Sequence, residues 1–270
     1  MITSPQNPKI KAAARLRDAR GRKKQGRFVV DGVREIGRAL GAGIRFAEAF
    51  ICEEIGTEGQ RAEVARLVRE LRGAEITRVS VAVFEKLAFG DRTEGIVAVA
   101  ETPSWGLKRL ERTVLGETPL IGVIERIEKP GNVGAVLRSA DGAGLRGLIV
   151  ADPRSDLFNP NTIRASLGTL FTVPVATAST TEAIQWLRNR NISIFAAWVD
   201  GSISYETADY RGASAIVLGN EAEGLSPAWA AEGMQRVRLP MHGTADSLNI
   251  SAAAAVLFYE ARRQRGKPPG

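Results

Sequence analysis

Histidine and cysteine are nearly absent from this 270-residue chain, which contains one of each. Cys52 lacks a second cysteine for an intramolecular disulfide, and His242 lacks the further ligands of a multi-histidine metal site. A Ser-His-Asp triad would have to combine His242 with its neighbours Asp246 and Ser247. Residues so close in sequence rarely share the geometry of a triad. The sequence therefore predicts no metal site and gives little support to a hydrolytic triad.

Long apolar runs are also absent, since none approaches the roughly 18 residues of a membrane span. Residues 1–11 lack the apolar core of a signal peptide, and no G-x-x-x-x-G-K-[ST] phosphate-binding loop is present. Gly142, Gly144 and Gly147 spell G-x-G-x-x-G, but a helical pattern precedes them and a strand pattern follows, the reverse of a dinucleotide site. We expect a cytoplasmic protein with no membrane partner.

Aromatic residues make up only 6% of the chain, and none precedes Phe28. Residues 1–27 instead hold nine basic residues against one acid, a net charge of 9 − 1 = +8 in a chain of net charge +7. A basic end attracts a polyanion by counterion release, although a basic tail that only aids solubility has the same composition. Without aromatic side chains, we expect this arm to contact phosphates rather than stack on bases. A second basic cluster consists of Arg262, Arg263, Arg265 and Lys267.

The first hundred residues read as a small α/β unit behind a helical arm. Residues 7–20 predict a helix in which Asn7 is the cap and Pro8 lies in the first turn. Strands are predicted at 28–32, 46–52, 74–80 and 95–100, and helices at 33–43 and 58–73. Residues 102–118 contain prolines, glycines and mixed charge, which predicts a linker between domains at 1–101 and 119–270.

Beyond residue 119, strand and helix patterns alternate strictly, which predicts an α/β fold with a mostly parallel sheet and helices on both faces. Strands are predicted at 120–127, 147–152, 171–177, 192–199, 215–219 and 234–240. Helices are predicted at 132–141, 161–168 and 181–190, from the Ser226-Pro227 pair, and at the C-terminus to about residue 265.

Three segments, 128–144, 216–226 and 239–251, place Gly, Pro, Asn or Ser where an apolar strand meets a loop or helix. Open α/β sheets bind their ligands at such points. In the first segment, Gly131 permits a bend, Asn132 can cap the next helix, and Arg138 lies nearly two turns along it.

The order and content of these segments resemble the three motifs of the SpoU (TrmH) branch of the SPOUT RNA methyltransferases. Residues 20–100 are weakly similar to a ribosomal-protein-like RNA-binding domain of many relatives. The resemblance implies a knotted catalytic domain, a homodimer whose active sites use both subunits, and transfer of a methyl group from S-adenosylmethionine to a ribose 2′-hydroxyl. The sequence departs from the usual pattern at Lys129, where many relatives have an acid or Asn, and at Ser139, where Thr is usual.

The resemblance also implies roles for individual residues. The implied catalytic residues are Arg138, Asn132, Glu221, Ser247 and Asn249. The implied cofactor-binding residues are Leu218, Gly219, Asn220, Glu221, Leu239, Pro240, Met241, Ser247, Leu248 and Asn249. Because a guanidinium is effectively never deprotonated in proteins, we expect Arg138 to stabilise alkoxide charge rather than act as a base.

Predicted RNA contacts are Arg15, Arg22, Lys23, Lys24, Arg27, Arg164 and Ser166. The last two belong to a further family-like stretch at 163–171, where Ser166 could equally end a turn. The sequence thus predicts a dimeric 2′-O-methyltransferase of structured RNA, with ribosomal RNA as the first choice of substrate and tRNA as the second. A non-catalytic RNA-binding or assembly protein on the same fold is the alternative from a different class.

Overall fold

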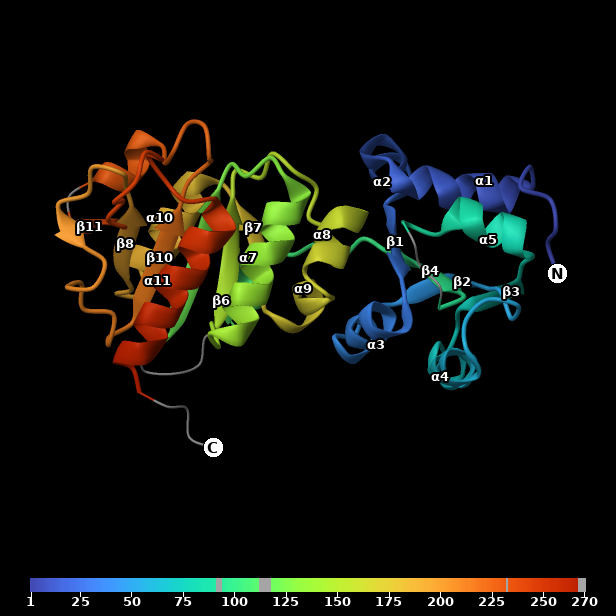
Figure 1. Ribbon diagram of the computed structural model, residues 1–270. Helices are drawn as coiled ribbons and strands as arrows, with labels where there is room; N and C mark the ends of the chain where they lie inside the picture. The colour runs from blue at the N-terminus through green and yellow to red at the C-terminus, as the bar shows by residue number, and fades with distance from the viewer. Residues whose placement is uncertain (91–93, 112–117, 232, 267–270) are drawn as a thin grey trace. The chain divides into compact units, whose positions relative to one another are not determined.

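The computed structural model describes residues 1–90, 94–111, 118–231 and 233–266 (Figure 1). The chain forms two compact units. Unit 1 comprises Met1–Ser104 and Phe158–Thr172, and unit 2 comprises Trp105–Leu157 and Val173–Gly270. Part of the expected linker, residues 112–117, lies outside the described residues. Within the described part of that linker, Trp105 and Leu110 are buried in unit 2.

Unit 1 contains a four-stranded sheet of order β1-β4-β2-β3, in which β4 runs antiparallel to both β1 and β2 while β2 and β3 are parallel. The strands are β1 (Arg27–Asp31), β2 (Phe46–Ile51), β3 (Glu75–Arg78) and β4 (Ile96–Glu101). The helices are α1 (Pro8–Ala14), η1 (Arg15–Arg17), α2 (Ala19–Gln25), α3 (Val33–Gly41), α4 (Glu58–Glu70), α5 (Val81–Leu87), α8 (Pro160–Ala165) and α9 (Thr169–Thr172). Helix α5, which is short and mostly apolar, was not predicted.

The N-terminal arm starts as predicted, because the side chain of Asn7 accepts a hydrogen bond from the Lys9 amide and caps α1. The single expected helix is instead two short helices joined by η1. A β-carbon at Gly21 would lie 1.9 Å from the carbonyl oxygen of Arg15, so only glycine permits α2 to approach η1 this closely. Residues 158–172 pack with this unit because Phe158 and Phe171 contact Phe28, with ring centroids 4.5 and 6.2 Å away.

Unit 2 contains a seven-stranded sheet of order β7-β6-β5-β10-β8-β11-β9, and every pair in it is parallel. The strands are β5 (Leu120–Glu125), β6 (Gly147–Ala151), β7 (Val175–Ala178), β8 (Ser193–Ala197), β9 (Ile203–Ser204), β10 (Ser214–Leu218) and β11 (Met234–Arg238). The helices are α6 (Lys108–Glu111), α7 (Pro130–Gly142), α10 (Thr180–Arg188), η2 (Pro227–Ala230) and α11 (Ile250–Gln264). The predicted α/β class and parallel sheet are confirmed, and the knot stays a prediction.

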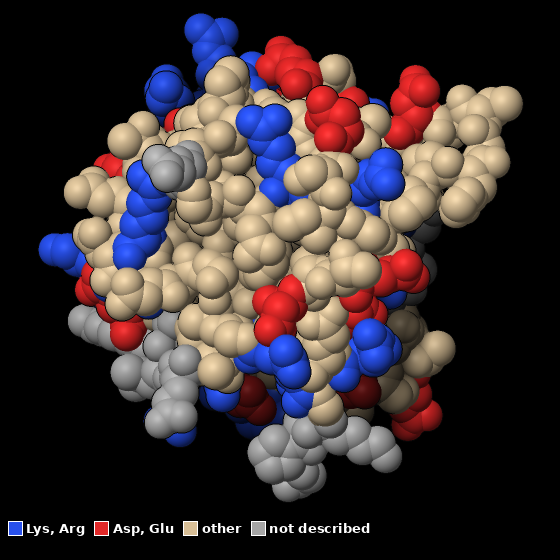
Figure 2. All heavy atoms as spheres, turned by 90° about the vertical axis from the view of Figure 1, so that its left-hand side faces the viewer, with Lys and Arg blue, Asp and Glu red and all other residues tan. Residues whose placement is uncertain are grey.

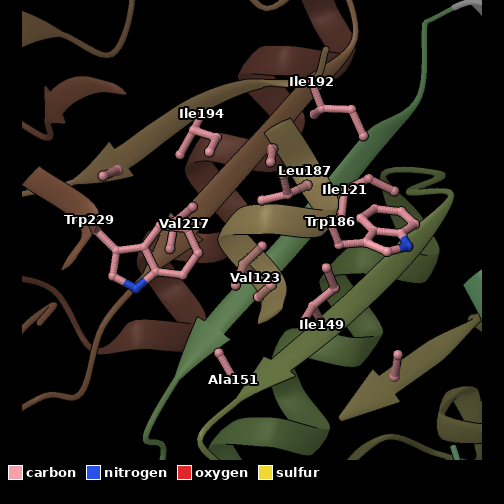
Figure 3. Packing of buried hydrophobic residues seen from close by; sticks show 14 of the residues in the cluster. Ile121, Val123, Ile149, Ala151, Trp186, Leu187, Ile192, Ile194, Val217 and Trp229 are labelled. Carbon is pink, nitrogen blue, oxygen red and sulfur yellow. The ribbon is translucent and has the colours of Figure 1, made fainter. Parts of the chain in front are cut away.

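Helices cover both faces of this sheet because neighbouring strand residues point to opposite sides. Ile121 and Val123 of β5 join a buried cluster with Trp186 of α10 and Trp229 of η2 (Figure 3). Between them, Gly122 faces the other way, and a β-carbon there would lie 3.1 Å from Phe258 of α11. On that second face α7 and α11 lie side by side (Figure 1).

Several predicted boundaries in unit 2 are wrong. The strand expected from residue 171 begins at Val175, because Phe171 and Thr172 complete α9. The helix expected from Ser226 is the short 3-10 segment η2, and β9 was not predicted. Helix α7 begins at Pro130, so Asn132 lies inside its first turn and does not cap it.

Candidate functional site

The carboxyl ends of β8, β10 and β11 meet at one edge of the sheet, because the three strands are parallel neighbours. A cavity of about 610 Å³ opens there. Its walls come from the end of β10 and its loop (Leu218–Leu225), from Leu239 and Met241 after β11, and from Asp246–Leu248 before α11. The second and third sequence motifs therefore form one cavity, as the resemblance implies.

Most of the predicted cofactor-binding residues line this cavity. They are Leu218, Gly219, Asn220, Glu221, Leu239, Met241, Ser247 and Leu248. Pro240 and Asn249 are not among the lining residues, although each adjoins one. Sequence reasoning missed Ala197, Trp198, Val199 and Asp200 at the end of β8, and Ile250 and Ala253 on α11. The position of 197–200 at the carboxyl end of a buried strand marked them as candidates, but the order of the strands was needed to bring them to this cavity.

The loop after β10 is a tight hairpin. The amide of Asn220 donates to the carbonyl of Gly224 at 3.1 Å, and the Gly224 amide donates back at 2.9 Å. A β-carbon on Gly219 would lie 2.3–2.5 Å from backbone atoms of Gly224 and Leu225, so this position accepts only glycine without rearrangement. The strand end thus brings its backbone directly to the cavity.

Three of the predicted catalytic residues meet at Glu221. Its Oε1 accepts hydrogen bonds from the Nδ2 atoms of Asn132 and Asn249, both at 2.6 Å. Its Oε2 lies 3.1 Å from Nζ of Lys129. Asn249 also caps α11, because its side chain accepts a hydrogen bond from the Ser251 amide. One carboxylate therefore joins the starts of α7 and α11 to the loop after β10.

The other two predicted catalytic residues stand apart from this cluster. Arg138 is exposed on α7, does not line the cavity and makes no hydrogen bond or ion pair with the described residues. Ser247 is exposed and lines the cavity. Within one chain, the structure therefore assembles Asn132, Glu221 and Asn249 and leaves Arg138 outside.

The basic side chains of the N-terminal arm are of two kinds: some are exposed, and Arg22 is buried and hydrogen-bonded within the arm. Lys11, Arg15, Arg20, Lys23 and Lys24 are exposed and have no ion-pair partner among the described residues. Arg22, in contrast, is 3% exposed, and its guanidinium donates to the carbonyls of Leu16 and Arg17. Arg22 therefore joins α2 to η1, and the prediction that it contacts an RNA phosphate is wrong.

The remaining predicted RNA contacts also differ in availability. Arg27 pairs with Glu48 at 3.0 Å, whereas Arg164 is exposed beside Phe89. Ser166 is fully buried and donates to the carbonyl of Ile163, so it ends a turn and cannot reach a phosphate.

Two residues of the basic cluster at the C-terminus, Arg263 and Arg265, bind other groups of unit 2. The guanidinium of Arg265 donates to the carbonyls of Thr118, Tyr210 and Gly212. Arg263 pairs with Glu260, and Lys267 lies outside the described residues. On the face of unit 2 shown in Figure 2, cations and carboxylates are interspersed around an uncharged centre.

The described part of the chain contains neither a cluster of metal-ligating side chains nor a membrane-spanning helix. No group of three or more His, Cys, Asp or Glu side chains there could hold a metal ion. None of the described helices is both long and apolar enough to cross a membrane.

Residues 119–259 match the model of the SpoU rRNA Methylase family, and residues 7–98 match the MRM3-like substrate binding domain. The chain therefore belongs to the SpoU rRNA methylase family, as its three motifs predicted.

Among relatives, the chain is 34% identical over 254 residues to a 23S rRNA (uridine(2479)-2′-O)-methyltransferase of Streptomyces viridochromogenes, covering 90% of this chain and 85% of that protein. Among solved structures, an RNA 2′-O ribose methyltransferase is 41% identical, with a TM-score of 0.80 and 98% of each chain covered. The SpoU methyltransferase AviRb from Streptomyces viridochromogenes, in complex with AdoMet, is 29% identical with a TM-score of 0.86, covering 96% of this chain and 98% of that one.

Proposed function

We propose that this protein transfers a methyl group from S-adenosylmethionine to a ribose 2′-hydroxyl of ribosomal RNA, with 23S rRNA as the first candidate. The observation that carries the proposal is the cavity at the ends of β8, β10 and β11, where the family motifs converge around Glu221. The 23S rRNA methyltransferase of Streptomyces viridochromogenes matches nearly the whole chain, both units included, which favours ribosomal RNA over tRNA.

The residues of the cavity fit S-adenosylmethionine. Its volume of about 610 Å³ lies within the range of small-molecule sites, roughly 300–1,000 Å³. Leu218, Leu239 and Leu248 offer apolar contacts for an adenine ring, and the carboxylates of Asp200 and Glu221 offer acceptors for hydroxyl and ammonium groups. When bound, the cofactor supplies an electrophilic methyl group on a sulfonium.

The protein's own part in the reaction is alignment and charge stabilisation. We propose that Glu221 holds Asn132 and Asn249 in fixed positions beside the cavity, with Ser247 on the neighbouring wall. Arg138 would stabilise the developing alkoxide of the 2′-hydroxyl or hold the adjacent phosphate.

Arg138 lies outside the cavity of its own chain, which supports a homodimer in which this residue completes the partner's site. The exposed Val256 and Tyr259 on α11 support α11 as part of the dimer contact. Within this proposal, residues 119–270 form the catalytic domain with the family's knot. Residues 1–101 bind cytoplasmic RNA through Arg15, Lys23 and Lys24.

The test is transfer of labelled methyl from S-adenosylmethionine to unmodified 23S rRNA, 16S rRNA and total tRNA in parallel, with Arg138→Ala as a control. We expect label in 23S rRNA at a single site resistant to alkaline cleavage, and its loss in the variant. Label only in tRNA would replace the proposed substrate. Binding of RNA without any binding of S-adenosylmethionine would instead identify a non-catalytic RNA-binding protein.

A further inference from the structure

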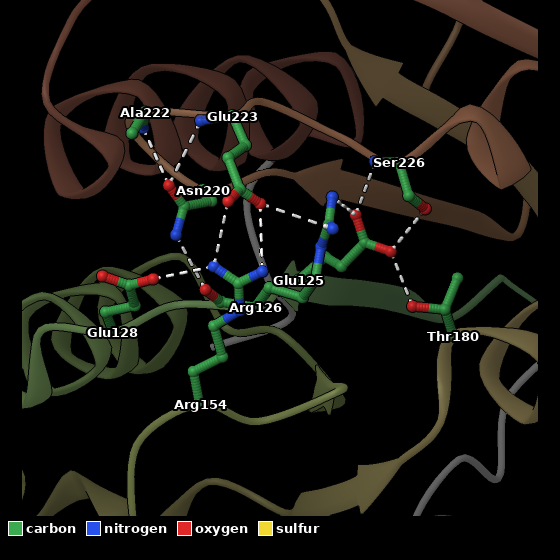
Figure 4. Close-up of polar contacts among 9 residues, drawn as sticks. All are labelled: Glu125, Arg126, Glu128, Arg154, Thr180, Asn220, Ala222, Glu223 and Ser226. Carbon is green, nitrogen blue, oxygen red and sulfur yellow. Dashed lines mark hydrogen bonds and ion pairs between the residues drawn. The ribbon is translucent and has the colours of Figure 1, made fainter.

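A buried carboxylate lies behind the cavity wall, outside every family motif discussed above. Glu125 is the last residue of β5 and is fully buried, yet it does not line the cavity. It accepts hydrogen bonds from the Thr180 hydroxyl at 2.6 Å and from both the amide and the hydroxyl of Ser226 at 2.7 Å (Figure 4). Its partners come from two different elements: Thr180 opens α10, and Ser226 ends the loop after β10.

These hydrogen bonds keep the carboxylate charged. Burial alone would raise the pKa of Glu125, but the donors on Thr180 and Ser226 outweigh it and hold the pKa below its ordinary value. A buried charge is tolerated only while its hydrogen-bond partners stay in place, because leaving it without them is costly. Ser226 is therefore tied to β5 in one geometry.

The start of the loop, at Asn220, is also anchored at the carboxyl end of β5. Asn220 donates through Nδ2 to the carbonyl of Arg126 at 2.9 Å, and its Oδ1 accepts from the amides of Ala222 and Glu223. Figure 4 shows Asn220 and Ser226 on either side of the end of β5. The segment between these two anchors supplies a continuous wall of the cavity.

A set of more exposed ion pairs also contacts the loop but contributes less to holding it in place. Arg126 and Arg154 both pair with Glu223, at 3.4 and 3.0 Å, and Arg154 also pairs with Glu128 at 2.7 Å. The side chains of Glu223 and Glu128 are about half exposed. Solvent screens such pairs, so they contribute little to holding the loop.

We propose that Glu125 is a positioning residue, which fixes residues 219–226 in the shape that S-adenosylmethionine binding requires. The inference rests on the proposed function, since that loop is a wall of the proposed cofactor site. A loop held in its binding shape before the ligand arrives loses less conformational entropy on binding, so its anchors raise affinity without touching the ligand.

The test compares Glu125→Ala with Glu125→Gln by calorimetry of S-adenosylmethionine binding and by steady-state kinetics. We expect Glu125→Ala to bind S-adenosylmethionine about 10- to 100-fold more weakly and to raise the KM for S-adenosylmethionine by a similar factor. Its kcat at saturating cofactor should change by less than about threefold. Gln should stay within about threefold of wild type, because its oxygen can accept from the Ser226 amide while its NH₂ donates to the hydroxyl oxygens of Thr180 and Ser226.

Glu111→Gln is the matched control, since Glu111 forms an exposed ion pair with Arg190 in the same unit and does not line the cavity. If Glu125→Ala does not fold, Ser226→Ala and Thr180→Val, which each remove one donor, take its place. A folded Glu125→Ala protein with wild-type cofactor affinity would overturn the inference. A Glu125→Gln protein that binds the cofactor as weakly as Glu125→Ala would overturn it too. Absence of cofactor binding by wild-type protein would overturn the proposed function itself, a result readily distinguished from these.

Discussion

Glu125 lies behind the loop that follows β10, whereas Glu221 belongs to that loop and lines the cavity, and the two carboxylates have different partners. Glu125 is fully buried and takes its hydrogen-bond donors from hydroxyl and backbone groups, with the guanidinium of Arg126 3.7 Å away. The side chain of Glu221 is 28% exposed and takes its donors from two amide side chains and an ammonium group. The first carboxylate fixes where the loop lies, whereas the second gathers side chains at the cavity.

The contrast separates three places of change by their expected effects. Changes on the cavity side, at Glu221, should act on the chemical step, because Glu221 and its partners Asn132 and Asn249 are the proposed catalytic residues. Changes to the loop backbone should act on cofactor affinity. Changes behind the loop, at Glu125, should act on affinity and on acid stability.

The largest effect is expected from Glu221→Ala, which removes the shared acceptor of Asn132 and Asn249. We expect the transfer rate at saturating substrates to fall by about 100-fold or more, the scale seen when one preorganised polar group is lost from an active site. Single-turnover methyl transfer measures this, with Glu111→Ala as an exposed carboxylate control. A wild-type rate would show that the cluster at Glu221 only supports structure.

A smaller effect is expected from Gly219→Ala, which places a methyl group 2.3 Å from the backbone of Gly224. The hairpin must shift, and overpacking of this kind costs about 1–3 kcal/mol. We expect S-adenosylmethionine to bind about 10- to 100-fold more weakly by calorimetry. Gly212→Ala is the control, because a β-carbon there meets no atom within 4 Å. Equal affinities of the two variants would contradict the role given to the loop.

The sequence predicted the parallel sheet because each apolar run and each helical period is a local pattern. It could not predict the order of the strands. Residues 197–200 reach the cavity because β10 inserts between β5 and β8, which depends on pairings distant in sequence. Local patterns also misjudged Arg22, since a basic run reads as exposed while the fold buries one of its members.

The residues of the site could be predicted from the sequence only where they belong to one of the three motifs. Asn132, Glu221 and Asn249 were identified from motif positions, and the structure joins them in one cluster. Glu125 was missed because it lies inside the strand predicted at 120–127 and outside the three motif segments. Its burial depends on Thr180 and Ser226, which lie 55 and 101 residues further along the chain.

The smallest effect is expected in the pH dependence of stability, and it tests the buried side of the loop alone. Hydrogen bonds hold the pKa of Glu125 below its ordinary value of 4.5 despite burial. A lowered folded-state pKa contributes stability above the unfolded pKa, and that contribution is lost as pH falls through the folded pKa. Glu125→Gln lacks this contribution.

We therefore expect wild type to exceed Glu125→Gln in free energy of unfolding by about 1–2 kcal/mol at pH 7, the scale of a charge-assisted hydrogen bond. The difference should shrink as pH falls below about 4.5, the ordinary value for this carboxyl. Urea unfolding at a series of pH values measures it. A difference that stays constant to pH 3 would mean that the pKa of Glu125 is the same in the folded and the unfolded protein. The contrast with Glu221 would then rest on burial alone.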